Sequence, residues 1–330
     1  MNNTDTRAGP SRRAFVSLGI GAFAVALAPR FLRPGPRLYR RTVPLMGTIA
    51  DIGVVHHDER AANLAINAAI EALRDAESAL TWFRDDSEIG RANRYAARDG
   101  VNVSASTADL VARSLRWAEA TDGAFDPAIG RLVRAWNVTR NVAPPPVAVR
   151  QRFAGRRLYR HVETDVRAAG GVLRFHDPDV SLDLGGIAKG WGVDRAVSAL
   201  RDHVVRNALV NVGGDLYAMG NAADGDAWRV GIRSPANPLR LLSTFDVTDR
   251  AVATSGDYEQ AFIHDGRRYH HLLDPLTAEP RLVEMHSITV AADLCVTADA
   301  AATALFGTTD ASAMHAVNRI APDAVIVDAG

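Results

Sequence analysis

The sequence is poor in cysteine, in excess charge of either sign and in long apolar runs. Its single cysteine, Cys295, excludes an intramolecular disulfide framework and a zinc site built from cysteines. Lys+Arg and Asp+Glu both number 38, and no long basic block is present, so nucleic acid is not expected as a partner. At 330 residues with 47% hydrophobic composition, the chain can bury a full core as one large or two medium domains.

The first thirty residues are predicted to be an export signal. A Ser-Arg-Arg-x-Phe pattern from Ser11 precedes a mildly apolar segment, 14–28, that is too short to span a bilayer comfortably. This pattern is typical of a twin-arginine signal peptide over 1–30, and a basic, proline-containing linker is predicted over 31–41. The alternative is an uncleaved membrane anchor, because Pro29 follows a small-residue cleavage site. We expect export to the periplasm or the outer face of the cytoplasmic membrane, without stable membrane insertion after cleavage.

Residues 42–330 are predicted to form one catalytic unit of α+β class, with mixed, largely antiparallel sheets and helices packed on them. Apolar residues at three- and four-residue spacing predict an amphipathic helix over 59–80, and a polar loop is expected over 82–94. Further helices are expected at 107–121, after Lys189 and from about Ala298. Strands are expected at 41–55, 172–175, 181–184, 207–212, 228–232, 241–247, 251–255, 270–274 and 287–292.

The stretch SLDLGGIAKG, residues 181–190, joins a predicted strand to a predicted helix through two glycines and a lysine. It is not a P-loop, because Lys189 follows Gly185-Gly186 by three residues and no Ser or Thr comes next. The glycines still allow the backbone to approach a ligand, and Lys189 at a helix start favours an anion. From these residues alone, phosphate binding and a plain strand-to-helix turn both remain open.

Two further groups carry oxygen and titratable side chains. Asp299 and Thr303 are four residues apart in an alanine-rich run, so they share one helix face and offer oxygen ligands of the kind magnesium accepts. The alternative is a solvated Asp and a Thr bonded to its own helix. The second group has the composition of an active site without a serine-hydrolase elbow or zinc spacing, and contains Thr254, Ser255, Asp257, His270, His271 and Asp274.

The order of these motifs along the chain resembles the ApbE family, the FAD:protein FMN transferases. The resemblance covers nearly all of residues 42–310. It runs through Met46-Gly47-Thr48, the segment from Trp82 to Glu88 with Asn93, 122–127, 183–190 with Asp194, 211–215, 254–258, 271–275 and 298–303. It implies an ApbE-like, T-fold-related catalytic unit.

The resemblance also implies an activity and a site. Family members bind FAD with a divalent metal, normally Mg²⁺, transfer the FMN half to a Thr or Ser hydroxyl of a protein and release AMP. The acceptor partner would be an exported, flavin-carrying electron-transfer protein. Carried over by position, the residues around FAD would be Met46, Phe83, Ala124, Phe125, Asp126, Asp183, Lys189 and Leu273. The metal would be held by Asp299, Thr303 and the carbonyl of Gly186, and the catalytic group would comprise His271, Asp257 and Asp274.

Two positions depart from the family pattern. Ala278 replaces a glycine in the Asp-Pro-x-Thr-Gly-x-Pro loop, which predicts a different loop conformation near the site. Phe83 stands where the flavin-stacking residue is often Tyr, so the ring is kept and the hydroxyl lost.

Two other activities stay open. An FAD pyrophosphatase would use the same residues with water as the acceptor. A flavin-binding carrier without turnover is the third interpretation, although flavin storage requires no magnesium ligands.

Overall fold

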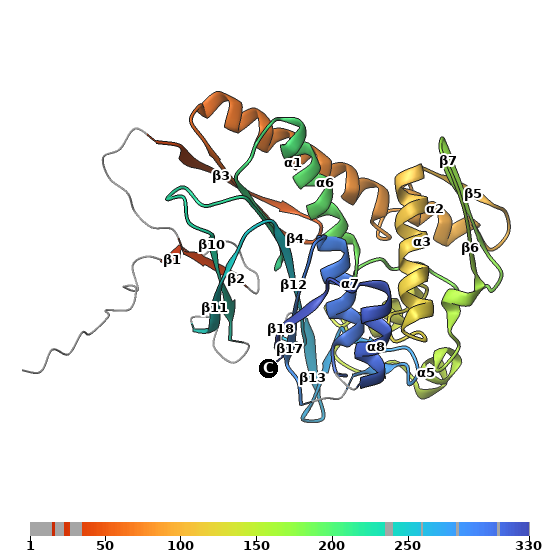
Figure 1. The fold of residues 1–330 in the computed structure, drawn as a ribbon. Helices are drawn as coiled ribbons and strands as arrows, with labels where there is room; N and C mark the ends of the chain where they lie inside the picture. The colour runs from red at the N-terminus through yellow and green to blue at the C-terminus, as the bar shows by residue number, and fades with distance from the viewer. Residues whose placement is uncertain are drawn as a thin grey trace, which may run out of the picture.

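A computed structural model describes residues 35–234, 240–258, 260–281, 284–308 and 311–329, together with the backbone of two short N-terminal strands. Its centre is a seven-stranded sheet in which every neighbouring pair is antiparallel (Figure 1). The strand order is β18 (Val325–Ala329), β17 (Ser287–Ala292), β12 (Arg250–Gly256), β9 (Asp215–Met219), β8 (Ala208–Val212), β4 (Thr48–His56) and β3 (Arg37–Leu45). The predicted α+β class with largely antiparallel sheets is confirmed.

The described residues form eight helices, three of which make the main contacts with one face of this sheet. The eight helices are α1 (Glu59–Leu80), α2 (Glu88–Tyr95), α3 (Ala105–Ala120), α4 (Gly130–Trp136), α5 (Val147–Phe153), α6 (Ala188–Asp202), α7 (Cys295–Leu305) and α8 (Ala311–Ile320), with a 3₁₀ turn at Leu158–His161. Figure 1 shows α1, α6 and α7 on the same side of the sheet, where α6 contacts both α1 and α7. The predicted amphipathic helix over 59–80 is confirmed as α1, whose buried residues recur every three to four positions from Ala62 to Leu80.

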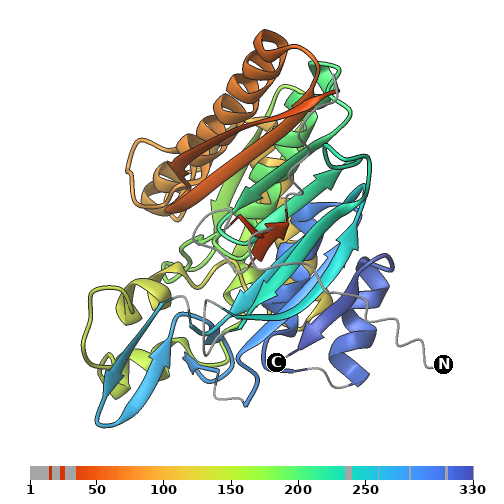
Figure 2. The same cartoon turned by 90° about the vertical axis from the view of Figure 1, so that its left-hand side faces the viewer.

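Smaller sheets complete the fold. On the opposite face of the large sheet, β10 (Trp228–Arg233) and β11 (Leu241–Val247) pack through a second apolar cluster that includes Trp228 and Leu216. The other short sheets pair β5 (Val101–Val103), β7 (Gly170–Phe175) and β6 (Val162–Arg167), β13 (Ala261–His264) with β14 (Arg267–His270), and β15 (Leu273–Asp274) with β16 (Glu279–Pro280). Figure 2 shows the β13–β14 hairpin beside the segment that contains α4 and α5, where Tyr269 stacks on Trp136 at 5.6 Å.

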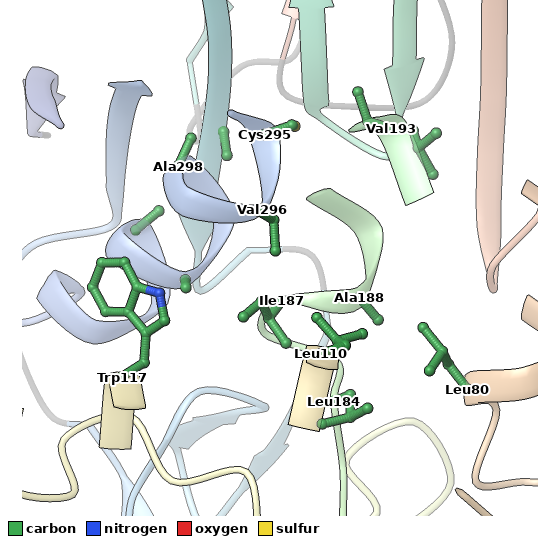
Figure 3. Close-up of a cluster of buried hydrophobic side chains, with 14 of the residues drawn as sticks. Leu80, Leu110, Trp117, Leu184, Ile187, Ala188, Val193, Cys295, Val296 and Ala298 are labelled. Carbon is green, nitrogen blue, oxygen red and sulfur yellow. The ribbon is translucent and has the colours of Figure 1, made fainter. Parts of the chain in front are cut away.

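The main core lies beneath the region where the predicted site residues converge. Ile187 and Ala188 at the start of α6, Val296 of α7 and Leu110 of α3 meet in one apolar cluster (Figure 3). Each is at most 9% exposed. Because close-packed interiors resist displacement, this cluster fixes the starts of α6 and α7 relative to each other.

The predicted strand over 41–55 is a hairpin rather than one strand. Met46 and Gly47 have φ angles of 53° and 69°, and this two-residue turn reverses the chain between β3 and β4. β3 begins at Arg37, inside the segment 31–41 that the sequence predicts to be a linker. The reason is cross-strand pairing, which extends from Leu45 opposite Thr48 to Arg37 opposite His56 and is not visible in the local composition.

The predicted loop over 82–94 contains a helix, α2. Ser87 caps it by accepting a hydrogen bond from the amide of Gly90, and Glu88 follows in the first turn. Ile89 and Ala92 are fully buried. The Ser87-Glu88 pair is a helix start signal in the sequence. A loop was nevertheless predicted, because most residues of the segment are polar.

The predicted twin-arginine signal lies outside the described residues, apart from the backbone of β1 (Phe15–Val16) and β2 (Phe23–Ala26). These strands pair with each other, and β2 pairs with β10. Within the part of the chain that the structure describes, no helix is long and apolar enough to cross a membrane.

Candidate active site

Lys189, the second residue of α6, lies between two buried carboxylates. Its Nζ forms an ion pair with Oδ2 of Asp215 at the start of β9, and Oδ1 of Asp299 on α7 is 3.6 Å away. The two carboxylates are 1% and 3% exposed. Lys189 is the only lysine of the chain, in which every other Lys+Arg residue is arginine. A compact ammonium fits between two carboxylates, whereas a guanidinium would present a planar fork.

The site depends on a close approach of α6 to α7. A Cβ on Gly190 would lie 2.3 Å from the carbonyl oxygen of Cys295, so only glycine fits at this position. The Gly190 amide donates to Oδ2 of Asp299 at 2.9 Å. Asp194, one turn further along α6, accepts hydrogen bonds from the amides of Cys295 and Val296 and thereby caps α7. Burial raises the pKa of Asp194 to about 6.

One turn after Asp299, three uncharged oxygens converge. The hydroxyl of Thr303 donates to the carbonyl oxygen of Gly186 at 3.3 Å, and Oγ of Ser255 on β12 is 3.5 Å from Thr303 Oγ1. The predicted metal group of Gly186, Asp299 and Thr303 is therefore brought together where α7 meets the turn before α6. Ser255, which the sequence places in the second titratable group, lies beside this metal group instead.

The chemistry of this oxygen set fits a hard divalent cation. A carboxylate, a hydroxyl and a main-chain carbonyl are the donors that Mg²⁺ accepts, and Mg²⁺ commonly completes its shell with water and substrate phosphate. Among the described residues, no group of three or more His, Cys, Asp or Glu side chains could hold a metal ion. The donor set therefore matches a sparse magnesium site better than a zinc or calcium cage, and its role remains a prediction.

The turn 122–127 contacts this region from the side. The carbonyl oxygen of Pro127 accepts a hydrogen bond from the amide of Asp183 at 2.8 Å. A Cβ on Gly186 would lie 3.2 Å from the ring of Phe125, which is 4% exposed. Asp183 accepts the amide of Gly185, and burial raises the pKa of its carboxyl. The structure thus brings the predicted FAD residues of two separate motifs to one place.

The segment 181–184 is not the strand that the sequence predicts. Its only described strand-like pairing is a parallel bridge from Ser181 to Ile129. The side chain of Asn93 on α2 supplies the other backbone partner, because it donates to the carbonyl of Leu182 and accepts from its amide. The extended segment is thus held by a turn and a side chain instead of a sheet.

Asp126 in the turn 122–127 has a buried carboxyl, so its contribution to the free energy of unfolding depends on pH. Its Oδ1 accepts the amide of Ala128 at 2.8 Å, and burial raises its pKa from 3.8 to about 6. The folded state therefore binds this proton more tightly than the unfolded chain. The resulting stabilisation is present below pH 4 and is lost as the pH rises to 6. Asp126→Asn cannot ionise, so we expect it to exceed the wild type in free energy of unfolding by about 1–3 kcal/mol at pH 7.5 and to match it near pH 4.

Urea unfolding of the ligand-free proteins at both pH values measures this difference. Asp122→Asn is the matched control, because Asp122 lies on the exposed side of the same turn in an ion pair with Arg157. Equal unfolding free energies for wild type and Asp126→Asn at pH 7.5 would contradict a raised pKa of the Asp126 carboxyl.

A cleft lies at the ends of β3 and α1, and two of its lining residues, Leu45 and Arg84, are the chain neighbours of Met46 and Phe83. The cleft has a volume of about 490 Å³, with Leu45, Arg74, Glu77, Ser78, Thr81 and Arg84 as its lining. The amide of Met46 donates to Glu77, and its sulfur would lie 2.8 Å from a Cβ on Gly192 of α6. Phe83 is 80% exposed and stacks on Trp82 at 4.2 Å. An exposed ring supported by a second ring offers a stacking surface for a flat ligand.

The adjacent histidines His270 and His271 have different environments. His270 is buried: its Nε2 is 2.7 Å from the carbonyl oxygen of Arg281, and its Nδ1 accepts the amide of Leu272. His271 is half-buried, with Nδ1 3.4 Å from the carbonyl oxygen of Gln260. Burial, aided by the positive charge of Lys189, lowers the pKa of His271 to about 4. His271 is therefore neutral at physiological pH and can accept a proton.

The two predicted carboxylate partners of His271 are engaged elsewhere. Asp257 forms an ion pair with Arg268 at 2.7 Å and a hydrogen bond with Nδ1 of His286 at 3.1 Å, although its charge also raises the pKa of His271. Asp274 accepts the amide of Leu276 in a turn. Leu273, predicted to contact FAD, is 8% exposed in β15. In this geometry Asp257 orients His286, a residue that no motif of the sequence pointed to.

Comparison with known proteins decides the family. The model of the ApbE family matches residues 46–326. The chain belongs to the ApbE family. It is 33% identical over 264 residues to the FAD:protein FMN transferase of Vibrio cholerae, covering 79% of each chain. It is 34% identical over 288 residues to that of Treponema pallidum, covering 82% of this chain and 78% of the relative. The crystal structure of the ApbE protein of Thermotoga maritima superposes with a TM-score of 0.78 at 29% identity, covering 88% of this chain and 94% of the other.

The departure of Ala278 from the ApbE pattern leaves the turn geometry in place. Ala278 has a φ of 58°, which is the left-handed conformation that glycine adopts readily. Its amide donates to the carbonyl of Asp274, and its own carbonyl accepts the indole N–H of Trp136 at 2.9 Å. These bonds stabilise a left-handed conformation that an alanine residue would otherwise disfavour. The left-handed conformation that the loss of glycine disfavours is therefore present at Ala278.

Proposed function

We propose that this ApbE-family chain is a magnesium-dependent FAD:protein FMN transferase acting on an exported redox protein. The observation that carries the proposal is that Lys189 lies 3.6 Å from Asp299, while Thr303, one turn further along α7, donates to the carbonyl of Gly186. The names of the relatives in Vibrio cholerae and Treponema pallidum support the same activity. The Mg²⁺ requirement, the Thr or Ser acceptor and the release of AMP are part of the proposal.

Some of these residues would neutralise the charge of the phosphates, and another would accept a proton. Asp299, Thr303 and the Gly186 carbonyl would hold Mg²⁺, which supplies charge neutralisation for the FAD pyrophosphate. The Lys189 ammonium would lie against the same phosphates and stabilise the negative charge that develops on the departing AMP. Phe83, Phe125 and Met46 would contact the ring systems of FAD. Water exclusion follows from the buried positions of Phe125, Asp126 and Leu273.

The transfer step exchanges the phosphoanhydride bond of FAD for a phosphoester bond to the acceptor. The acceptor hydroxyl oxygen attacks the FMN phosphorus, the bond from that phosphorus to the bridging oxygen breaks, and AMP leaves with the bridging oxygen. His271 would take the hydroxyl proton. An Nδ1–H that donates to the Gln260 carbonyl leaves Nε2 as the proton acceptor. Water in place of the hydroxyl would give FMN and AMP, which is the hydrolase alternative.

The lowered pKa of His271 predicts an unusual pH profile. Since kcat/KM reports the free enzyme, its acid limb should lie near pH 4, the pKa of His271, and the rate should be flat from about pH 5.5 to 7.5. Rates of FMN transfer at saturating Mg²⁺, measured from below the His271 pKa of about 4 up to about pH 7.5, provide the test. His271→Gln, which cannot act as a base, should be slow and should lack the limb. An acid limb centred near pH 6.5 in the wild type would contradict this assignment.

Flavin fluorescence of protein bands provides the direct test of the activity. Purified protein is incubated with FAD, Mg²⁺ and exported proteins from the same cell, then separated under denaturing conditions. We expect a fluorescent acceptor band that is absent with a chelator. Free FMN and AMP without a band would favour the hydrolase, and unchanged FAD would favour the carrier.

Export by the twin-arginine route is a separate part of the proposal. It rests on the Ser-Arg-Arg-x-Phe pattern at Ser11 and the apolar segment that follows. Replacement of Arg12 and Arg13 by lysine should retain the chain in the cytoplasm. Unchanged export of that variant would contradict the route without bearing on FMN transfer.

A further inference from the structure

Arg281 connects three parts of the site that are far apart in the sequence. It follows β16, and its side chain crosses to the C-terminal end of α7. There Nη1 donates to the carbonyls of Thr303 (3.2 Å), Ala304 (3.3 Å) and Phe306. Nη2 donates to the carbonyl of Ala124 in the turn 122–127. One guanidinium therefore joins the helix that carries Asp299 and Thr303 to the turn that carries Phe125 and Asp126.

The end of α7 needs such a partner. The last carbonyls of a helix have no intrahelical donor, and the helix dipole concentrates partial negative charge there. In α7 no Lys, Arg or His lies in the last turn, so the compensating cation comes from outside the helix. Arg281 supplies it at the turn that begins with Thr303. The main-chain position of Thr303 is thereby fixed by a side-chain contact from a distant segment.

The backbone of Arg281 is also fixed by hydrogen bonds. Its amide donates to the carbonyl of Leu272 at 2.9 Å, and its carbonyl oxygen is 2.7 Å from Nε2 of His270. These two bonds fix the segment on both sides of His271. The residue thus connects the predicted base to the predicted metal group through a short series of hydrogen bonds.

The surroundings of the guanidinium make the arrangement specific to arginine. Burial lowers the pKa of Arg281, and its four described hydrogen-bond partners are neutral carbonyls. A buried cation is tolerated when its donors are satisfied, and the planar guanidinium can donate to several carbonyls at once. The ammonium of lysine has three donors and cannot span the same set.

We propose that Arg281 is a positioning residue for the metal site, which it maintains by holding Thr303 and the 122–127 turn in register. The inference rests on the proposed function, because the metal is part of that function. Residues that orient metal ligands without touching the metal commonly change metal affinity by about 10- to 100-fold when replaced. Loss of Arg281 should therefore weaken metal binding at temperatures where the protein stays folded.

Mn²⁺ binding measured by electron paramagnetic resonance tests this without requiring turnover. With FAD present, Arg281→Met should raise the Kd for Mn²⁺ by about 10- to 100-fold, and Arg281→Lys should give an intermediate value. Arg250→Met is the matched control, because Arg250 also donates to a main-chain carbonyl, that of Asp323, but lies at the opposite end of β12 from Ser255. The control should bind Mn²⁺ like the wild type. Circular dichroism at the assay temperature verifies that each variant is folded.

Chemical rescue separates positioning from general loss of structure. Added methylguanidinium should restore Mn²⁺ affinity to Arg281→Ala at least in part, and should not change Arg250→Ala. Unchanged Mn²⁺ affinity in folded Arg281→Met, or an equal loss in Arg250→Met, would overturn the inference. If the wild type binds Mn²⁺ but transfers no FMN, the proposed function fails while the role of Arg281 at the metal is still measured.

Discussion

Asp299→Asn is expected to lower the rate of FMN transfer by about 100- to 1,000-fold, because it removes the only carboxylate of the predicted metal group. The substitution keeps the size of the side chain and leaves an oxygen that can accept the Gly190 amide. Since the variant makes the pocket less negative, metal-free FAD should bind no more weakly than to the wild type. Initial rates over a Mg²⁺ titration, with FAD affinity followed by flavin fluorescence, measure both effects.

Asp51→Asn is the matched control for Asp299→Asn. Asp51 is 3% exposed and paired with Arg40 on β3, so it also loses a buried charge, but it lies outside the predicted site. Its transfer rate should stay near that of the wild type under conditions where it is folded. A similar fall in both variants would indicate that Asp299 acts through stability alone.

Lys189→Met is expected to lose both transfer and stability. Removal of the ammonium leaves Asp215 buried without its ion-pair partner, which costs several kcal/mol when a pair is fully buried. Because the Lys189 side chain is 26% exposed, we expect a smaller loss of about 1–3 kcal/mol. Transfer should fall by about 100-fold or more, since one stabilising charge at the phosphates is gone.

A double variant separates these two effects. Lys189→Met with Asp215→Leu removes both charges of this ion pair. Stability should therefore recover in part, because buried Asp299 still loses the neighbouring ammonium, while transfer stays low. Thermal unfolding and transfer rates of the two single variants and the double variant complete the cycle. Recovery of transfer in the double variant would show that Lys189 only neutralises Asp215.

The sequence predicted the parts of the fold that depend on local pattern. The boundaries of α1 followed from the spacing of Ala, Leu and Ile, and β17 from a run of six strand-forming residues. The segment 181–184 was wrongly predicted as a strand, because its backbone partners are Asn93 and the turn near Pro127. Such partners depend on tertiary contacts that no local pattern encodes.

Candidate site residues could be named from the sequence, but their pairing could not. The motif order grouped Lys189, Asp299 and Thr303. In the structure Lys189 lies 3.6 Å from Asp299 and Thr303 contacts the Gly186 carbonyl, while their roles stay predictions. The pairing of Lys189 with Asp215 and of Asp257 with His286 was not predicted, because these contacts depend on how strand ends align. Arg281 had no signal in the sequence, since its role appears only when the end of α7 lies against it.

The central claim is that FMN leaves FAD for a protein hydroxyl at this site. Peptide mass spectrometry of exported proteins after incubation with the enzyme, FAD and Mg²⁺ tests it most directly, with released AMP quantified in the same sample. We predict an FMN phosphoester on a Ser or Thr side chain, one AMP per adduct, and neither product with Asp299→Asn. AMP and free FMN without an adduct, or an adduct formed equally well by Asp299→Asn, would contradict the account.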